Sequence, residues 1–155
     1  MKKSTKFIIA LLVTVGALAI TYRVVNQAPS KDLAADAQMQ EIITSGGCLQ
    51  CHSGSPDLPF YANWPVASGM VQKDVTQGYR AFDMTEMAEA LKAGKPVGKV
   101  ALAKVEKVIM DGTMPKHAYY MVHWGSSVTD AKKEMAMAWV CLLYTSPSPR
   151  DGLLS

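Results

Sequence analysis

The sequence is poor in cysteine and histidine, with three of each in 155 residues. The cysteines stand at 48, 51 and 141, and an odd number with two members so close together is not typical of a disulfide-stapled secreted domain. A structural zinc site needs four ligands, usually arranged as two pairs at motif spacing. The histidines at 117 and 123 stand six positions apart, at the wide limit for such a pair, and no second close pair of cysteines is present, so the pair at 48 and 51 needs another explanation.

Charged residues are also sparse and nearly balanced, with 16 basic and 13 acidic residues and a net charge of +3. The basic residues form no run interleaved with aromatic residues, which argues against a nucleic-acid partner. No internal repeat is present, and no segment alternates as a strand would. We therefore expect one all-α domain with short helices and long loops over residues 30–140, preceded by a separate segment at 1–29.

The N-terminal segment is a basic stretch followed by an apolar one, which is the pattern of an export segment. The apolar run covers residues 7–25 if Arg23 snorkels toward the membrane interface, and a spanning helix needs about 20 residues. We favour an uncleaved membrane anchor; the alternative is a signal peptide cleaved near Ala17–Ala19. Lysines before the run predict a cytoplasmic N-terminus, with the domain on the periplasmic side of the inner membrane.

Helical periodicity and end signals predict the elements of the domain. The first helix ends at Gly46-Gly47, directly before Cys48. Residues 53–65 contain three prolines and are expected to form a loop, with Phe60 and Trp64 as its apolar anchors. Four more helices are predicted: one from Val66 through Tyr79, one opened by a capping box at Asp83–Glu86 and ended by Gly94, one over Ala101–Met110 ended by Gly112, and one opened by a capping box at Ser127–Asp130.

The stretch Cys48–His52 reads CLQCH, the CxxCH pattern of c-type haem attachment. Each thiol can form a thioether with one vinyl group of a haem, and the adjacent imidazole of His52 then becomes the proximal iron ligand. A thioredoxin-like redox pair would need a βαβ context, which the helical pattern does not provide. We predict one covalent haem c and an electron-transfer role.

A haem that only carries electrons generally has both axial positions filled, so a distal ligand is needed. Met114 is the first candidate, because it precedes Pro115 on a loop that follows a helix end. His123 and His117 are the alternatives, and either would give a bis-histidine site of lower reduction potential.

Together these residues resemble the N-terminal haem-binding domain of membrane-anchored bacterial three-haem cytochrome c peroxidases. The resemblance runs from about Gly47 to Val140 and is carried by CLQCHS at 48–53, LPFY at 58–61, WPV at 64–66, DV at 74–75, GYR at 78–80, FD at 82–83, GTMP at 112–115 and HW at 123–124. It implies a cytochrome c-like domain with His52 as proximal and Met114 as distal ligand. It also implies electrons that arrive from the quinol pool or a small redox protein and leave to a C-terminal dihaem peroxidase region.

The chain departs from that family in having no further CxxCH motif, which peroxide reduction there would need. Residues 143–151, LYTSPSPRD, resemble translated sequencing-adaptor read-through, so we expect residues 141–155, Cys141 included, to be a non-native tail. The sequence thus predicts the electron-input module of a truncated periplasmic peroxidase, without peroxidase activity of its own. A free-standing anchored monohaem cytochrome and a haem-based sensor are the alternatives.

Overall fold

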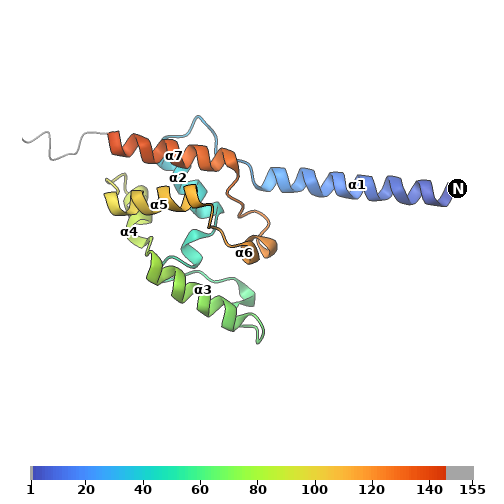
Figure 1. Cartoon of the computed structure of the whole chain (residues 1–155), viewed down its shortest axis with the longest axis horizontal. Helices are drawn as coiled ribbons and strands as arrows, with labels where there is room; N and C mark the ends of the chain where they lie inside the picture. The colour runs from blue at the N-terminus through green and yellow to red at the C-terminus, as the bar shows by residue number, and fades with distance from the viewer. Residues whose placement is uncertain (1, 146–155) are drawn as a thin grey trace, which may run out of the picture.

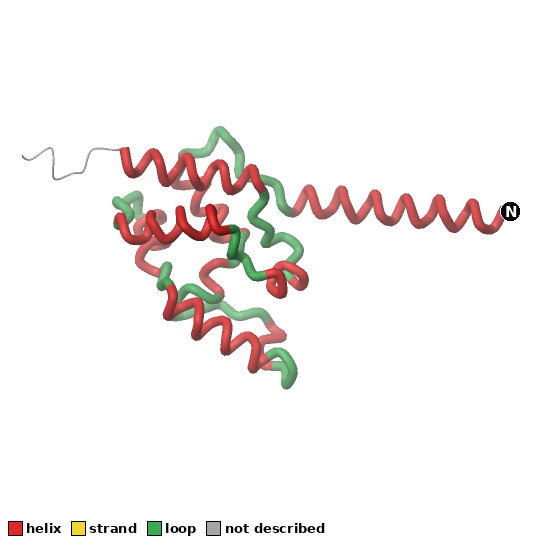
Figure 2. The backbone as a smooth tube through the Cα atoms, in the orientation of Figure 1, coloured by secondary structure: helices red, strands yellow, loops and turns green. Residues whose placement is uncertain are grey.

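The computed structural model describes residues 2–145 of the chain. This part is built from helices and loops and contains no strand (Figure 2), which confirms the predicted all-α fold. The helices are α1 (Lys2–Val25), α2 (Ala35–Ser45), α3 (Ser68–Ala81), α4 (Thr85–Lys92), α5 (Lys99–Asp111), α6 (His117–Val122) and α7 (Asp130–Thr145), with 3₁₀ turns η1 (Cys48–Gln50) and η2 (Phe60–Asn63). The expected non-native tail is described only to Thr145, the last residue of α7; residues 146–155 lie outside the described residues.

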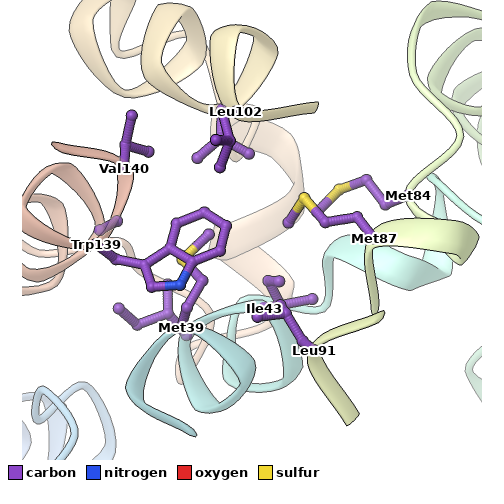
Figure 3. Packing of buried hydrophobic residues seen from close by; sticks show 11 residues of the cluster. Met39, Ile43, Met84, Met87, Leu91, Leu102, Trp139 and Val140 are labelled. Atoms are coloured by element: carbon purple, nitrogen blue, oxygen red, sulfur yellow. The ribbon is translucent and has the colours of Figure 1, made fainter. Parts of the chain in front are cut away.

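Four helices, α2, α4, α5 and α7, enclose the hydrophobic core (Figure 3). Trp139 of α7 and Leu102 of α5 are each 2% exposed, and α2 and α4 close the core from the other side. The indole Nε1–H of Trp139 donates to Asp36 Oδ1 at 2.7 Å, so the polar atom of this buried ring is satisfied. Burial of each such side chain contributes about 1.5–3 kcal/mol. We refer to α2, α4, α5 and α7 as the closed core.

Helix ends were predicted better than helix starts. Gly94 and Gly112 follow α4 and α5 as expected. Of the two predicted capping boxes, the one at Asp83–Glu86 is met by its aspartate alone, and the one at Ser127–Asp130 is wrong because the Ser127 hydroxyl has another partner. Asp83 Oδ1 accepts the N–H of Thr85 at 2.9 Å, and α4 begins only at Thr85. Ser127 Oγ pairs with the hydroxyl of Tyr22 at 2.9 Å, and α7 begins at Asp130.

The segments η2, α3 and α6 form a second layer beside the closed core (Figure 1), which we call the outer layer. Its apolar side chains are largely exposed, and Met70 of α3 is 62% exposed. The prediction that Phe60 and Trp64 anchor the loop is wrong, because they are 82% and 57% exposed. The 3₁₀ turn instead places the small Ala62 inward, at 1% exposure, and leaves the two large rings packed edge to face, 5.5 Å between centroids.

Helix α1 extends away from the domain (Figure 1). Its residues 4–25 are long and apolar enough to cross a membrane, and the apolar window is 0% buried, which suggests a membrane anchor or a signal peptide. The buried Asn26 follows directly. Its Nδ2 donates to the carbonyls of Tyr22 and Trp124 at 2.9 and 2.7 Å, and its Oδ1 accepts the N–H of Ser127 at 2.9 Å. We call Tyr22, Asn26, Trp124 and Ser127 the α1 junction.

Candidate functional site

The CxxCH motif lies where α2 ends and the chain reverses. Gly47 adopts a left-handed conformation, with φ of 66°, and this glycine turn leads straight into η1. The carbonyl of Cys48 then accepts the N–H groups of both Cys51 and His52, at 3.2 and 3.0 Å. A single tight turn therefore holds the two cysteines and the histidine together, and both cysteines are free thiols.

The imidazole of His52 is oriented by a backbone atom. Its Nδ1 lies 2.8 Å from the carbonyl oxygen of Phe82, the residue that ends α3. Because a carbonyl oxygen can only accept, the hydrogen must sit on Nδ1, which leaves the lone pair on Nε2. The neighbouring backbone is tied down as well, since the N–H of Met84 donates to the carbonyl of His52 at 2.7 Å. A histidine held in this tautomer is prepared to donate Nε2 to a metal.

Helix α3 approaches the motif so closely that one position must be glycine. A Cβ at Gly78 would lie 2.5 Å from the carbonyl oxygen of Cys51, a distance that real side chains do not adopt, and 3.0 Å from the Cys51 Cβ. Gly78 is also the buried residue of α3. The GYR stretch of the sequence therefore brings α3 against Cys51, and the end of the same helix supplies the carbonyl for His52.

Both thiols are held in their neutral form by burial. Desolvation raises the pKa of Cys48 to about 11 and raises the pKa of Cys51 as well. Lys132 lies close enough to act electrostatically on Cys48, and its Nζ donates to Ser45 Oγ at 3.3 Å and to the Ser127 carbonyl at 3.2 Å. Desolvation lowers the pKa of this lysine. No pattern in the sequence predicted this buried lysine beside the motif.

Among the three candidates for the distal ligand, both histidines have ring nitrogens engaged. His123 Nδ1 contacts the carbonyl of Tyr119 at 3.0 Å, so Nδ1 carries the hydrogen and Nε2 accepts from the hydroxyl of Tyr61 at 2.9 Å. His117 is hydrogen-bonded to the hydroxyl of Tyr120. Met114 is 37% exposed and lies on the loop between α5 and α6.

The residues that follow Met114 contact both α3 and the motif. Lys116 forms an ion pair of 2.6 Å with Asp74 of α3, and both charges act on Cys51. Tyr119 donates its hydroxyl hydrogen to Gln50 Oε1 at 2.8 Å, inside the CxxCH motif, and its ring stacks on His123 with 4.0 Å between centroids. Sequence reasoning missed this tyrosine–glutamine bond, whose only signal was a polar residue between the two cysteines.

The residues present fit a c-type haem. Two free thiols, an imidazole with its lone pair on Nε2 and a glycine that lets α3 approach form one constellation. The motif has no further ligands nearby to complete a zinc site: within residues 2–145, no group of three or more His, Cys, Asp and Glu could hold a metal ion.

Comparison with known proteins points the same way. The profile of the family described as "Haem-binding domain" matches residues 7–141. Cytochrome c peroxidase Ccp from Escherichia coli (strain K12) is 36% identical over 94 residues, which make up 61% of this chain and 20% of that protein. The chain thus spans about a fifth of the length of this relative. Among solved structures there is no significant match. The chain belongs to the haem-binding domain family, and it is related to the haem domain of a cytochrome c peroxidase.

Proposed function

We propose that the chain is an electron-transfer domain with one covalent haem c. The observation that carries the proposal is the hydrogen bond from His52 Nδ1 to the Phe82 carbonyl, which leaves Nε2 for iron beside two free thiols. Cys48 and Cys51 would hold the haem through thioethers, and His52 would be the proximal ligand. When bound, the group supplies a reversible one-electron iron couple.

Met114 is the distal ligand in this proposal. His123 and His117 would each have to break a hydrogen bond to a tyrosine before binding iron. Met114 instead lies just before Lys116, which is ion-paired with Asp74 of α3, and before Tyr119, which is bonded to Gln50 inside the motif. A thioether ligand gives a higher reduction potential than a second imidazole. The domain is therefore suited to accepting electrons from a quinol or a small redox protein.

The similarity to a cytochrome c peroxidase supports a role as the electron-input module of a longer enzyme. Electrons would enter at this haem and pass to a dihaem peroxidase region that follows this domain in the longer enzyme. Helix α1 would remain as an anchor in the bacterial inner membrane, with the domain on the periplasmic side. The α1 junction supports retention of the helix, because Asn26 and Tyr22 bind the domain directly.

The ligand assignment is tested with the full chain produced in a host that matures c-type cytochromes. Met114→Ala should convert the low-spin ferric spectrum to a high-spin one, because the iron loses its sixth ligand. His117→Ala is the matched control and should leave the low-spin spectrum unchanged. If Met114→Ala stays low-spin and a histidine variant does not, the distal ligand is that histidine.

The role as an input module is tested on the gene. Sequencing past codon 140 should reveal two further CxxCH motifs in the same reading frame. A complete gene without them would establish a free-standing monohaem carrier instead.

A further inference from the structure

We propose that the domain rests on the bilayer through a second contact, made by the loop around η2 and by α6. This surface, which we call the membrane rim, consists of Phe60, Trp64, Val66, Met121, Val122 and Trp124. The inference rests on the proposed function in one respect, namely that α1 stays in the membrane.

The membrane rim lies at the end of the domain from which α1 departs. In Figure 1, α6 and the start of α3 both lie toward the side of α1, whereas the turn between α4 and α5 lies at the opposite end. Figure 2 shows the loop before α3 as the tip of the outer layer on that same side. A bilayer crossed by α1 would therefore meet α6 and the η2 loop first.

The direction of α1 is fixed by the α1 junction rather than left to a flexible linker. Asn26 bonds to the carbonyls of Tyr22 and Trp124 and to the N–H of Ser127, and the Tyr22 hydroxyl bonds to Ser127 Oγ. The rings of Tyr22 and Trp124 also meet edge to face, 6.3 Å between centroids. These contacts join the last turn of the spanning helix to the residues that directly follow α6. The domain therefore cannot turn freely relative to the helix, and the same end always faces the membrane.

The chemistry of the rim suits the boundary between headgroups and acyl chains. Val66 is 94% exposed, Phe60 82%, Met121 72% and Val122 67%, and residues 60–66 carry no charge. Exposed apolar groups of this kind mark an interaction site, and tryptophan and tyrosine favour the membrane interface. The rings of Phe60, Tyr61 and Trp64 pack on one another edge to face, so the tip presents a preformed apolar surface. Because the membrane rim lies next to a membrane-spanning helix, we assign lipid, and not another protein, as its partner.

The test uses the full, haem-loaded chain in vesicles of phosphatidylcholine and phosphatidylglycerol. Nitroxide labels are placed at Val66→Cys and Met121→Cys in a Cys141→Ser background, and the control label is placed at Lys95→Cys, between α4 and α5. Collision rates with oxygen, which partitions into lipid, and with a water-soluble nickel complex are measured by electron paramagnetic resonance. The ratio of oxygen to nickel collisions should be several-fold higher at 66 and 121 than at 95.

Equal ratios at all three positions would overturn the proposal, because the rim would then lie in water and not in lipid. Because the labelled side chains are exposed, the haem absorption spectrum should be the same in all variants. Absence of the haem bands would count against the proposed function and not against the rim. A chain that no longer floats with the vesicles has lost its anchor, and that result would refute the rim and the anchor together.

Discussion

Two tryptophans, Trp139 and Trp64, lie in different layers of this small domain, and one is buried whereas the other is exposed. Trp139 packs inside the closed core at 2% exposure, and Trp64 follows η2 in the outer layer at 57% exposure. The closed core is completed by the chain's own side chains, whereas the outer layer leaves apolar groups exposed and touches the motif through Gly78 and Cys51. The CxxCH motif lies between the two layers, because Cys48 and Leu49 pack against the core cluster and Cys51 lies against Gly78 of α3.

The largest effect is expected from removing both motif thiols. The double variant Cys48→Ala, Cys51→Ala should lose covalent haem completely, as seen by haem staining after a denaturing gel, and Cys141→Ser should keep it. In the haem-free chain, hydrogen exchange should be faster in α3 than in α7, because α3 has only Gly78 buried whereas α7 supplies Trp139 to the core. Equal protection of the two helices would remove the distinction between the layers.

The two tryptophans themselves give the next test. Trp139→Ala should lower the free energy of unfolding by about 3–5 kcal/mol, because it leaves a cavity and removes the bond to Asp36. Trp64→Ala should change it by less than about 0.5 kcal/mol. Urea unfolding of the haem-loaded chain in detergent micelles measures both. A comparable loss at Trp64 would show that the outer layer carries stability too.

Substitution of two glycines of α3 tests the contact between the outer layer and the motif. Gly78→Ala should destabilise the domain by about 1–3 kcal/mol, since the new Cβ would press on the Cys51 carbonyl. The matched control is Gly69→Ala, which has nothing within 4 Å and should be neutral or stabilising by up to about 1 kcal/mol. Gly78→Ala should also shift the haem absorption bands, because α3 carries the partner of His52. Identical spectra for both variants would mean that α3 does not orient the histidine.

Near neutral pH, the smallest effect is expected from titration of Cys48, whose contribution to stability changes only above pH 9. Burial raises the pKa of Cys48 from 9.0 to about 11, so in the haem-free chain folding favours the neutral thiol. Its contribution to stability is full below pH 9 and is lost as the pH rises from 9 toward 11. Urea unfolding across this range should show the decline, which Cys48→Ser should reduce. An unchanged slope in that variant would assign the decline to other groups.

The fold was predictable where its signals are local. Helical periodicity and the glycines at 47 and 112 marked the ends of α2 and α5 correctly. The start of α7 was not predictable, because Ser127 is bonded to Tyr22, which lies 105 positions earlier in the sequence. Helix α6 was missed, since six residues are too few to display a period.

The candidate site, like the fold, was predictable only where its signals are local in the sequence. Cys48–His52 could be identified directly, because CxxCH is a contiguous pattern dictated by the two vinyl groups of haem. The bond between Gln50 and Tyr119 could not be identified, because it joins positions 69 residues apart and neither residue type demands the other. The exposure of Phe60 and Trp64 was likewise hidden, since hydrophobicity alone does not tell which side of a turn faces outward.

The carbonyl that holds His52 belongs to the backbone of Phe82 and not to its side chain. Any amino acid at position 82 supplies the same oxygen, so point substitution there leaves the atom in place. Substitution of Phe82 therefore does not change the tautomer of His52. The tautomer depends instead on the residue at which α3 ends. An insertion or deletion near the end of α3 would move the oxygen while leaving the CxxCH motif intact, and homologues could carry a perfect motif with a misdirected imidazole.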